Sequence, residues 1–138
     1  MYADVDWVRE LCLSFPKATE KVTWGADLTF RISEKIFAVT VLEPAKVWLS
    51  FKCSPQNFAD LTERTGIIPA PYMARAQWVA LETKEALQKD ELAGLLRESY
   101  DLVFGRLPRK TRQALLRPSR PKPRTKQRPI RRNSRKRP

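Results

Sequence analysis

Apolar and polar positions follow two different periods along residues 1–116, one typical of helices and the other typical of strands. Three segments are predicted to be helices, at about 4–15, 54–66 and 88–107. Four segments are predicted to be strands, at 28–32, 36–42, 47–53 and 77–82. The pattern therefore predicts the element order α-β-β-β-α-β-α, with one or two further helical turns over 109–116.

The predicted helix boundaries fall at residues that commonly start or stop helices. Asp4 can cap the first helix, and Pro16 ends it. Ser54 followed by a proline is a typical helix start, and Gly66 suits a left-handed position near the end of the second helix. Local chemistry and periodicity thus agree on where these two helices lie.

Short turns join the first three predicted strands, which favours an antiparallel meander. We predict an α+β fold with a single antiparallel sheet, helices on one face and an open second face. The folded domain is expected to span 1–112, followed by a basic, proline-rich tail over 113–138. Cys12 and Cys53 fall on apolar stripes, so both are expected to be free thiols in the core.

Alternation of side chains along the strands predicts which residues occupy the open face. In the segment 47–53, the apolar set is expected to face the helices and comprises Val47, Leu49, Phe51 and Cys53. The opposite set is expected to be exposed, together with residues of two other strands. The open-face candidates for stacking on bases or gripping a protein are Arg31, Trp48, Lys52 and Trp78. The alternative is that a loop or the last helix covers the tryptophans.

The composition argues against several classes of function. The chain has no histidine, and two isolated cysteines cannot complete a typical zinc site. Its four glycines form no phosphate-binding loop. We therefore expect no catalytic site, no metal and no cofactor. The chain has no long apolar run and no secretory signal, so no membrane association and a cytoplasmic location are expected.

The net charge of +12 is concentrated in the C-terminal segment 117–138, which has eleven basic residues and no acidic ones. Removing those eleven from the total of 27 leaves 16 basic residues against all 15 acidic ones in 1–116. The eleven are Arg117, Arg120, Lys122, Arg124, Lys126, Arg128, Arg131, Arg132, Arg135, Lys136 and Arg137. The folded part is thus about +1 and the tail about +11.

This basic tail has too few apolar residues to offset the entropy of ordering, so it is predicted to be disordered. A cationic arm gains affinity for a polyanion by releasing counterions, which favours DNA as the partner, with RNA as the alternative and the nucleoid as a candidate location. The alternative is that the tail only increases solubility and has no specific partner. Tyr72 and Arg75 lie in a predicted loop and are added to the candidate nucleic-acid contacts, whereas the loop residue Trp24 is expected to pack against the core.

Several short motifs together resemble the MmcQ/YjbR family over about residues 5–112. They are Leu11-Cys12-Leu13-Ser14-Phe15-Pro16, Trp24-Gly25, Phe30-Arg31-Ile32, Ser50-Phe51-Lys52-Cys53, Pro69-Ala70-Pro71-Tyr72-Met73, Trp78-Val79 and Ser99-Tyr100-Asp101-Leu102-Val103. The resemblance implies a CyaY-like, frataxin-like fold and DNA binding through a double-wing arrangement of hairpins and loops. Many members carry a histidine after the Trp-Gly pair and a basic residue or histidine before the later tryptophan. This chain has Ala26 and Gln77 there.

Two other functions stay open at this point. One is a protein-interaction module that uses the exposed sheet face. The other is frataxin-like metal handling, which is less favoured because the first helix offers only Asp4, Asp6 and Glu10, offset by Arg9. A monomer is expected.

Overall fold

The computed structural model describes residues 2–23, 25–71 and 76–116. Within these ranges the chain forms six strands and four α-helices, with one short 3-10 helix at Lys84–Ala86. The helices are α1 Val5–Ser14, α2 Pro55–Leu61, α3 Lys89–Gly105 and α4 Arg109–Leu116. The strands are β1 Thr19–Thr23, β2 Asp27–Ile32, β3 Lys35–Val41, β4 Leu49–Lys52, β5 Ile67–Pro69 and β6 Trp78–Leu81.

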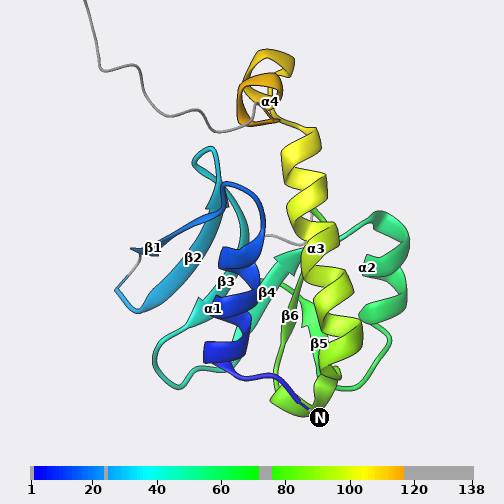
Figure 1. The fold of residues 1–138 in the computed structure, drawn as a ribbon. Helices are drawn as coiled ribbons and strands as arrows, with labels where there is room; N and C mark the ends of the chain where they lie inside the picture. Colours follow the sequence, from blue (N-terminus) through cyan, green and yellow to red (C-terminus); the bar gives the residue numbers. More distant parts are fainter. Residues whose placement is uncertain (1, 24, 72–75, 117–138) are drawn as a thin grey trace, which may run out of the picture.

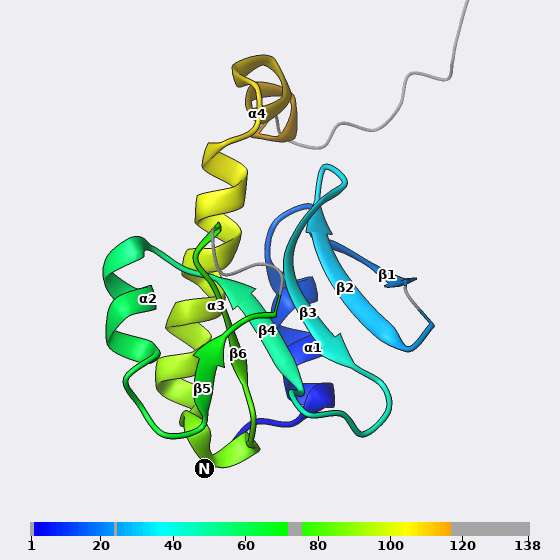
Figure 2. The ribbon, with the colours of Figure 1, turned by 180° about the vertical axis from the view of Figure 1, so that it is seen from behind.

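The six strands form one antiparallel sheet in the order β1-β2-β3-β4-β6-β5. Helices α1 and α3 lie over one face of this sheet, and the view from behind shows the strands with no helix in front of them (Figures 1 and 2). The predicted α+β class, with helices on one face, is therefore confirmed. No helix in the described ranges has the length and apolar character needed to cross a membrane.

Two strands were not predicted, and both lie at the edges of the sheet. β1 has no buried residue, because the sheet continues on only one side of it and its side chains are mostly polar. β5 is only three residues long and ends in Pro69, a residue that edge strands tolerate because it cannot donate a ladder hydrogen bond. Neither edge strand has the regular apolar alternation on which a strand prediction depends.

The predicted helix starts are confirmed by capping hydrogen bonds. The Asp4 carboxylate accepts from the backbone N–H of Trp7, and the Ser54 hydroxyl accepts from the backbone N–H of Asn57. The second helix is shorter than predicted and ends at Leu61. Gly66 follows it in turn structure with φ of 87°, so its left-handed conformation is as expected although it does not cap the helix directly. At the other end of the chain, α4 passes the predicted domain boundary at 112.

The core between the sheet and the helices contains a cluster of aromatic rings. Phe37 contacts Phe15, Phe30 and Tyr100, with ring centroids between 5.5 and 6.5 Å apart. Cys12 and Cys53 are buried free thiols, as expected. Burial raises the pKa of the Cys12 thiol far above its usual value and that of Cys53 to about 11, so both remain protonated near neutrality.

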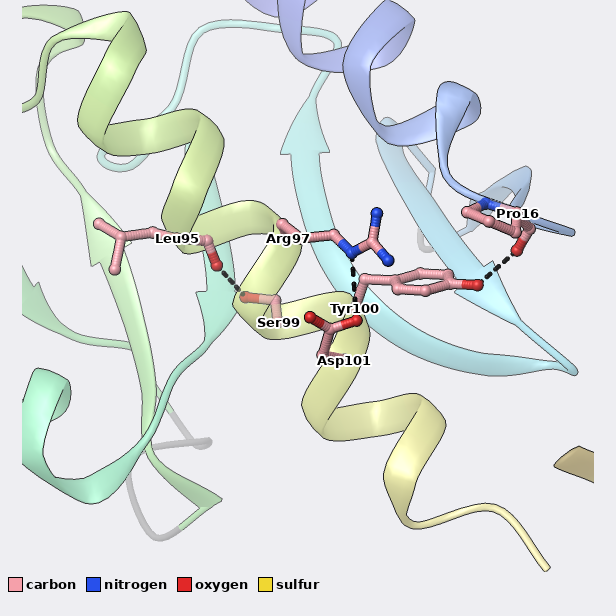
Figure 3. A network of polar contacts seen from close by, with 6 residues as sticks. All are labelled: Pro16, Leu95, Arg97, Ser99, Tyr100 and Asp101. Atoms are coloured by element: carbon pink, nitrogen blue, oxygen red, sulfur yellow. Dashed lines mark hydrogen bonds and ion pairs between the residues drawn. The ribbon is translucent and has the colours of Figure 1, made fainter. Parts of the chain in front are cut away.

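The Ser-Tyr-Asp motif of α3 contacts the sheet through Ser99 and the segment after α1 through Tyr100, and Figure 3 shows the second contact. The Tyr100 hydroxyl donates to the Pro16 carbonyl at 2.6 Å. Asp101 accepts from Arg97, whose guanidinium lies over the Phe15 ring. The buried Ser99 hydroxyl lies 3.1 Å from the Leu95 carbonyl and also contacts the carbonyl of Lys52. Ser99 and Tyr100 therefore connect α3 to other parts of the fold.

Candidate nucleic-acid interface

Trp48 is not on the open face, so this part of the predicted stacking surface is wrong. Its side chain is 7% exposed and belongs to the main core with Leu49, while its indole N–H donates to the Thr83 carbonyl at 3.0 Å. Val47, expected on the helix side, packs instead against a second apolar cluster that contains Trp78. The physical reason is a bend at Trp48: β4 begins only at Leu49, and alternation holds only within a regular strand.

Trp78 is part of the second apolar cluster, on the sheet face opposite the helices, but it is not exposed. Only 4% of its surface is accessible, and it packs with Ala70 and Ala80. The two tryptophans expected to form a shared surface thus belong to separate clusters. Both tryptophans are therefore buried, contrary to the expectation that they are exposed.

Lys52 is adjacent to Trp78 across the β4–β6 ladder and is also buried, contrary to the expectation of an exposed cation. The side chain is 5% exposed, and its ammonium group donates to the Ala76 carbonyl at 2.6 Å. Burial lowers the pKa of Lys52, and the nearby positive charge of Arg106 lowers it further. The Lys52 ammonium is therefore not available at the open surface of the sheet.

Arg31 is half-buried near the end of β2, where a bulge separates it from Phe30 in the register with β3. Its guanidinium donates to the Thr29 hydroxyl at 3.0 Å and to the Glu34 carbonyl at 3.4 Å. These bonds hold the side chain toward the β2–β3 turn. Trp24, Tyr72, Arg75 and the basic tail 117–138 lie outside the described residues.

The structure brings together a set of cations that the strand pattern alone did not connect. A cavity of about 410 Å³ lies at the end of the sheet where β3 begins, β4 ends and β6 begins. We call this the basic cavity. The residues that line it are Lys35, Lys52, Ala76, Trp78, Val103, Arg106, Leu107 and Pro108. It is therefore formed by the sheet end and by the C-terminal end of α3 with the segment that follows.

The charges of the basic cavity are not neutralised by the residues that line it. Among the described residues, its lining contains Lys35, Lys52 and Arg106 and no carboxylate. The ion pairs formed by described residues lie elsewhere and join Arg9 to Glu20, Arg64 to Glu91 and Arg97 to Asp101. An uncompensated group of cations beside apolar side chains produces a local positive potential that attracts anions.

The positive character continues from the basic cavity along the chain. Asp101 is the last acidic residue in the sequence, and the fifteen basic residues that follow it include Arg106, Arg109, Lys110 and Arg112 within the described part. Arg106, Arg109 and Lys110 are exposed. The sheet end with the β2–β3 turn is also the end from which α3 leads into α4 (Figures 1 and 2).

Sequence reasoning missed Lys35, Arg106 and the cations of α4 as candidate site residues. The sequence did contain a signal for Arg106, Arg109, Lys110 and Arg112, because no acidic residue follows Asp101 whereas basic residues continue. Dividing the charge at residue 117 placed these four with the near-neutral domain. No comparable signal existed for Lys35, whose neighbours at the cavity come from distant parts of the chain.

In the described part of the chain, no group of three or more cysteine or carboxylate side chains comes together as candidate metal ligands. Asp4 serves as the helix cap. Glu20, which lies opposite α1 on β1, accepts two hydrogen bonds from Arg9 at 2.7 and 2.8 Å. This bidentate contact lowers the pKa of Glu20.

Comparisons with known proteins identify the type of domain. A family model described as YjbR matches residues 13–102. A crystal structure of a Deinococcus radiodurans protein with a DUF419 domain aligns with a TM-score of 0.74 and 24% identity, covering 83% of this chain and 88% of that one. A Pseudomonas syringae protein aligns with a TM-score of 0.61 and 20% identity, covering 72% and 98%. A search of curated proteins finds no match.

Proposed function

This chain belongs to the YjbR family, and we propose that it binds nucleic acid through its basic C-terminal segment and the cationic end of its folded domain. The observation that carries this proposal is the unbroken positive charge after Asp101. It begins at Arg106 in the basic cavity, passes through α4 and continues over 117–138 with no acidic residue. DNA is the first expected ligand, as the family resemblance implies, and RNA is the alternative.

The two parts of this surface have different roles in the proposal. The tail supplies affinity by displacing condensed counterions from phosphates, without reading the sequence of bases. If about five of its cations contact phosphates, affinity falls about 500-fold between 50 and 200 mM salt. The cations of the basic cavity and α4 belong to a folded unit and therefore orient the domain on its ligand. We propose that this binding takes place in the cytoplasm, at the nucleoid if DNA is the ligand.

The test is fluorescence anisotropy with labelled duplex DNA and with RNA of matched length over a series of salt concentrations. The wild-type chain is compared with a full-length variant in which the eleven basic residues of 117–138 are replaced by glutamine. We expect the wild type to bind tightly at low salt and to lose affinity steeply as salt is added. The variant should lose most of the affinity at low salt and most of the salt dependence.

The control replaces three cations of the folded domain outside this surface, Lys21, Lys46 and Lys89, and is expected to bind as the wild type does. Absence of binding at low salt, or equal binding by the glutamine variant, contradicts the proposal. A marked preference between the two nucleic acids decides between DNA and RNA.

A further inference from the structure

The basic cavity contains a cation whose hydrogen-bonding capacity is only partly used. The Lys52 ammonium has three N–H donors, and within the described residues the Ala76 carbonyl is its one hydrogen-bond acceptor. Lys35 and Arg106 are exposed residues of the same cavity and form no ion pair within the described part of the chain. The arrangement leaves donors available to an incoming acceptor.

Placing like charges beside apolar side chains is costly for the protein alone. Lys52 is almost inaccessible to water, and Arg106 disfavours its charged form. A bound anion removes this cost by pairing with both cations, so the cavity is better suited to a ligand carrying more than one negative charge than to a neutral one.

The size and the remaining walls of the cavity show that a bare ion would not fill it. Its volume of about 410 Å³ lies in the range of pockets for small organic ligands. Trp78, Val103 and Leu107 supply an apolar wall next to the cations. A ligand that matches both parts has an anionic group joined to a less polar, partly planar body.

We propose that the basic cavity binds a nucleotide carrying a phosphate monoester. Lys35, Lys52 and Arg106 surround the phosphate, and the apolar wall contacts the attached sugar and base. This inference rests on the proposed function, since the cationic part of the sequence that includes α4 and the tail begins at the cavity residue Arg106. It adds a defined ligand, either a free mononucleotide or the 5′-phosphorylated end of a strand.

A monoester fits this cavity better than an internal phosphate does. A terminal phosphate carries about −1.5 to −2 charges near neutral pH, whereas a diester within a strand carries about −1. Three cations in one place match the larger charge. The α4 helix begins directly after the cavity residue Pro108, so the positive end of its dipole adds to the same potential.

The experiment measures binding of the full chain to a short single strand with a fluorophore at its 3′ end and either a phosphate or a hydroxyl at its 5′ end. We expect about tenfold tighter binding of the phosphorylated strand, as for a few charge-assisted hydrogen bonds. The variants Lys35→Ala and Arg106→Ala are expected to lose most of this preference. Both residues are exposed, so these variants should fold.

Two controls separate the cavity from general electrostatics. Arg109→Ala removes one charge just outside the cavity and is expected to weaken binding of both strands equally, keeping the preference. Lys46→Ala removes a charge in the β3–β4 loop and should change neither the affinity for the two strands nor the preference for the phosphorylated one. Lys52→Met, checked for folding by its thermal transition, should abolish the preference.

Competition with adenosine monophosphate and inorganic phosphate identifies the ligand source. Displacement of the phosphorylated strand by the mononucleotide supports a free nucleotide as ligand, and displacement only by phosphorylated strands supports a strand end. If inorganic phosphate displaces the strand as effectively as adenosine monophosphate does, the proposed role of the apolar wall is overturned. Equal binding of both strands by the wild type, or a preference that survives all three cavity variants, overturns this inference. No binding of either strand overturns the proposed function instead.

Discussion

The ammonium group of Lys52 lies 2.6 Å from the carbonyl oxygen of Ala76, in a side chain from which water is almost excluded. Its backbone carbonyl is contacted by the buried Ser99 hydroxyl, so the residue is held at both ends. The stability that a single backbone hydrogen bond supplies is small compared with the cost of burying a charge. The buried charge of Lys52 is therefore not expected to stabilise the fold.

Replacing Lys52 with methionine is therefore expected to raise the free energy of unfolding by about 1 kcal/mol at pH 7, because an apolar side chain of similar length removes a buried charge. Chemical denaturation of both proteins measures the difference. Lys46→Met, at an exposed site, is the control and should change stability by less than about 0.5 kcal/mol. A large loss of stability in Lys52→Met would show that the charge itself supports the fold.

The same substitution makes a prediction about pH. The pKa of Lys52 is lowered in the folded state from its ordinary 10.5, so the unfolded chain binds more protons between the two values. The penalty on the wild type is complete below the folded pKa and is relieved as pH rises toward 10.5. The stability advantage of Lys52→Met should accordingly shrink over this alkaline range, and an advantage independent of pH would contradict the assignment.

At the scale of elements, β1 is held to the rest of the molecule by its ladder with β2 and by a contact with α1. The Arg9 guanidinium donates two hydrogen bonds to the Glu20 carboxylate, which is the main cause of the lowered pKa of Glu20. This bidentate pair joins an edge strand to a helix that packs on the same sheet. We expect this pair to stabilise the fold and to take no part in binding, since Arg9 and Glu20 are far in sequence from the cationic residues after Asp101.

Replacing Glu20 with glutamine should lower the free energy of unfolding by about 0.5 to 1 kcal/mol at pH 7, since the pair is partly exposed. The folded pKa of Glu20 lies below 4.5, so its contribution is present above that value and is lost as pH falls through the folded pKa. Urea denaturation between neutral and acid pH measures the difference. Glu63→Gln, at an exposed carboxylate, is the control, and a difference that persists in acid would contradict the ion-pair explanation.

At the scale of the whole molecule, charge is separated along the chain. Residues up to Asp101 contain twelve basic and fifteen acidic side chains, and the fifteen other basic residues all follow. In the described part, this positive segment begins beside the basic cavity and continues through α4. The sequence therefore has a slightly acidic part up to Asp101 and a strongly cationic part after it.

Replacing Arg109, Lys110 and Arg112 with glutamine tests whether α4 contacts phosphates. Each lost contact should reduce the slope of log affinity against log salt concentration by about 0.9 for duplex DNA. Anisotropy titrations at several salt concentrations measure the slope, with the Lys21, Lys46 and Lys89 variant as the control of equal charge. An unchanged slope would confine the phosphate contacts to residues outside α4.

Much of the fold could be predicted because its central elements carry regular signals. The strand signals of β2 and β3 and the caps at Asp4 and Ser54 are local, and the structure confirms both strands and both caps. The edge strands β1 and β5 lack this alternation, since they do not have strands on both sides. The orientation of Trp48 depends on a bend before β4, which the spacing of residues does not reveal.

The sequence by itself determined the class of the fold, the family and the separation of charge, because each depends on residue type and order along the chain. Only the tertiary structure decided which cations meet. Lys35, Lys52 and Arg106 come from two strands and the end of a helix, and they share one cavity because the sheet end packs against the C-terminal end of α3. Burial also depends on these distant neighbours, which is why two tryptophans and a lysine expected at the surface lie inside.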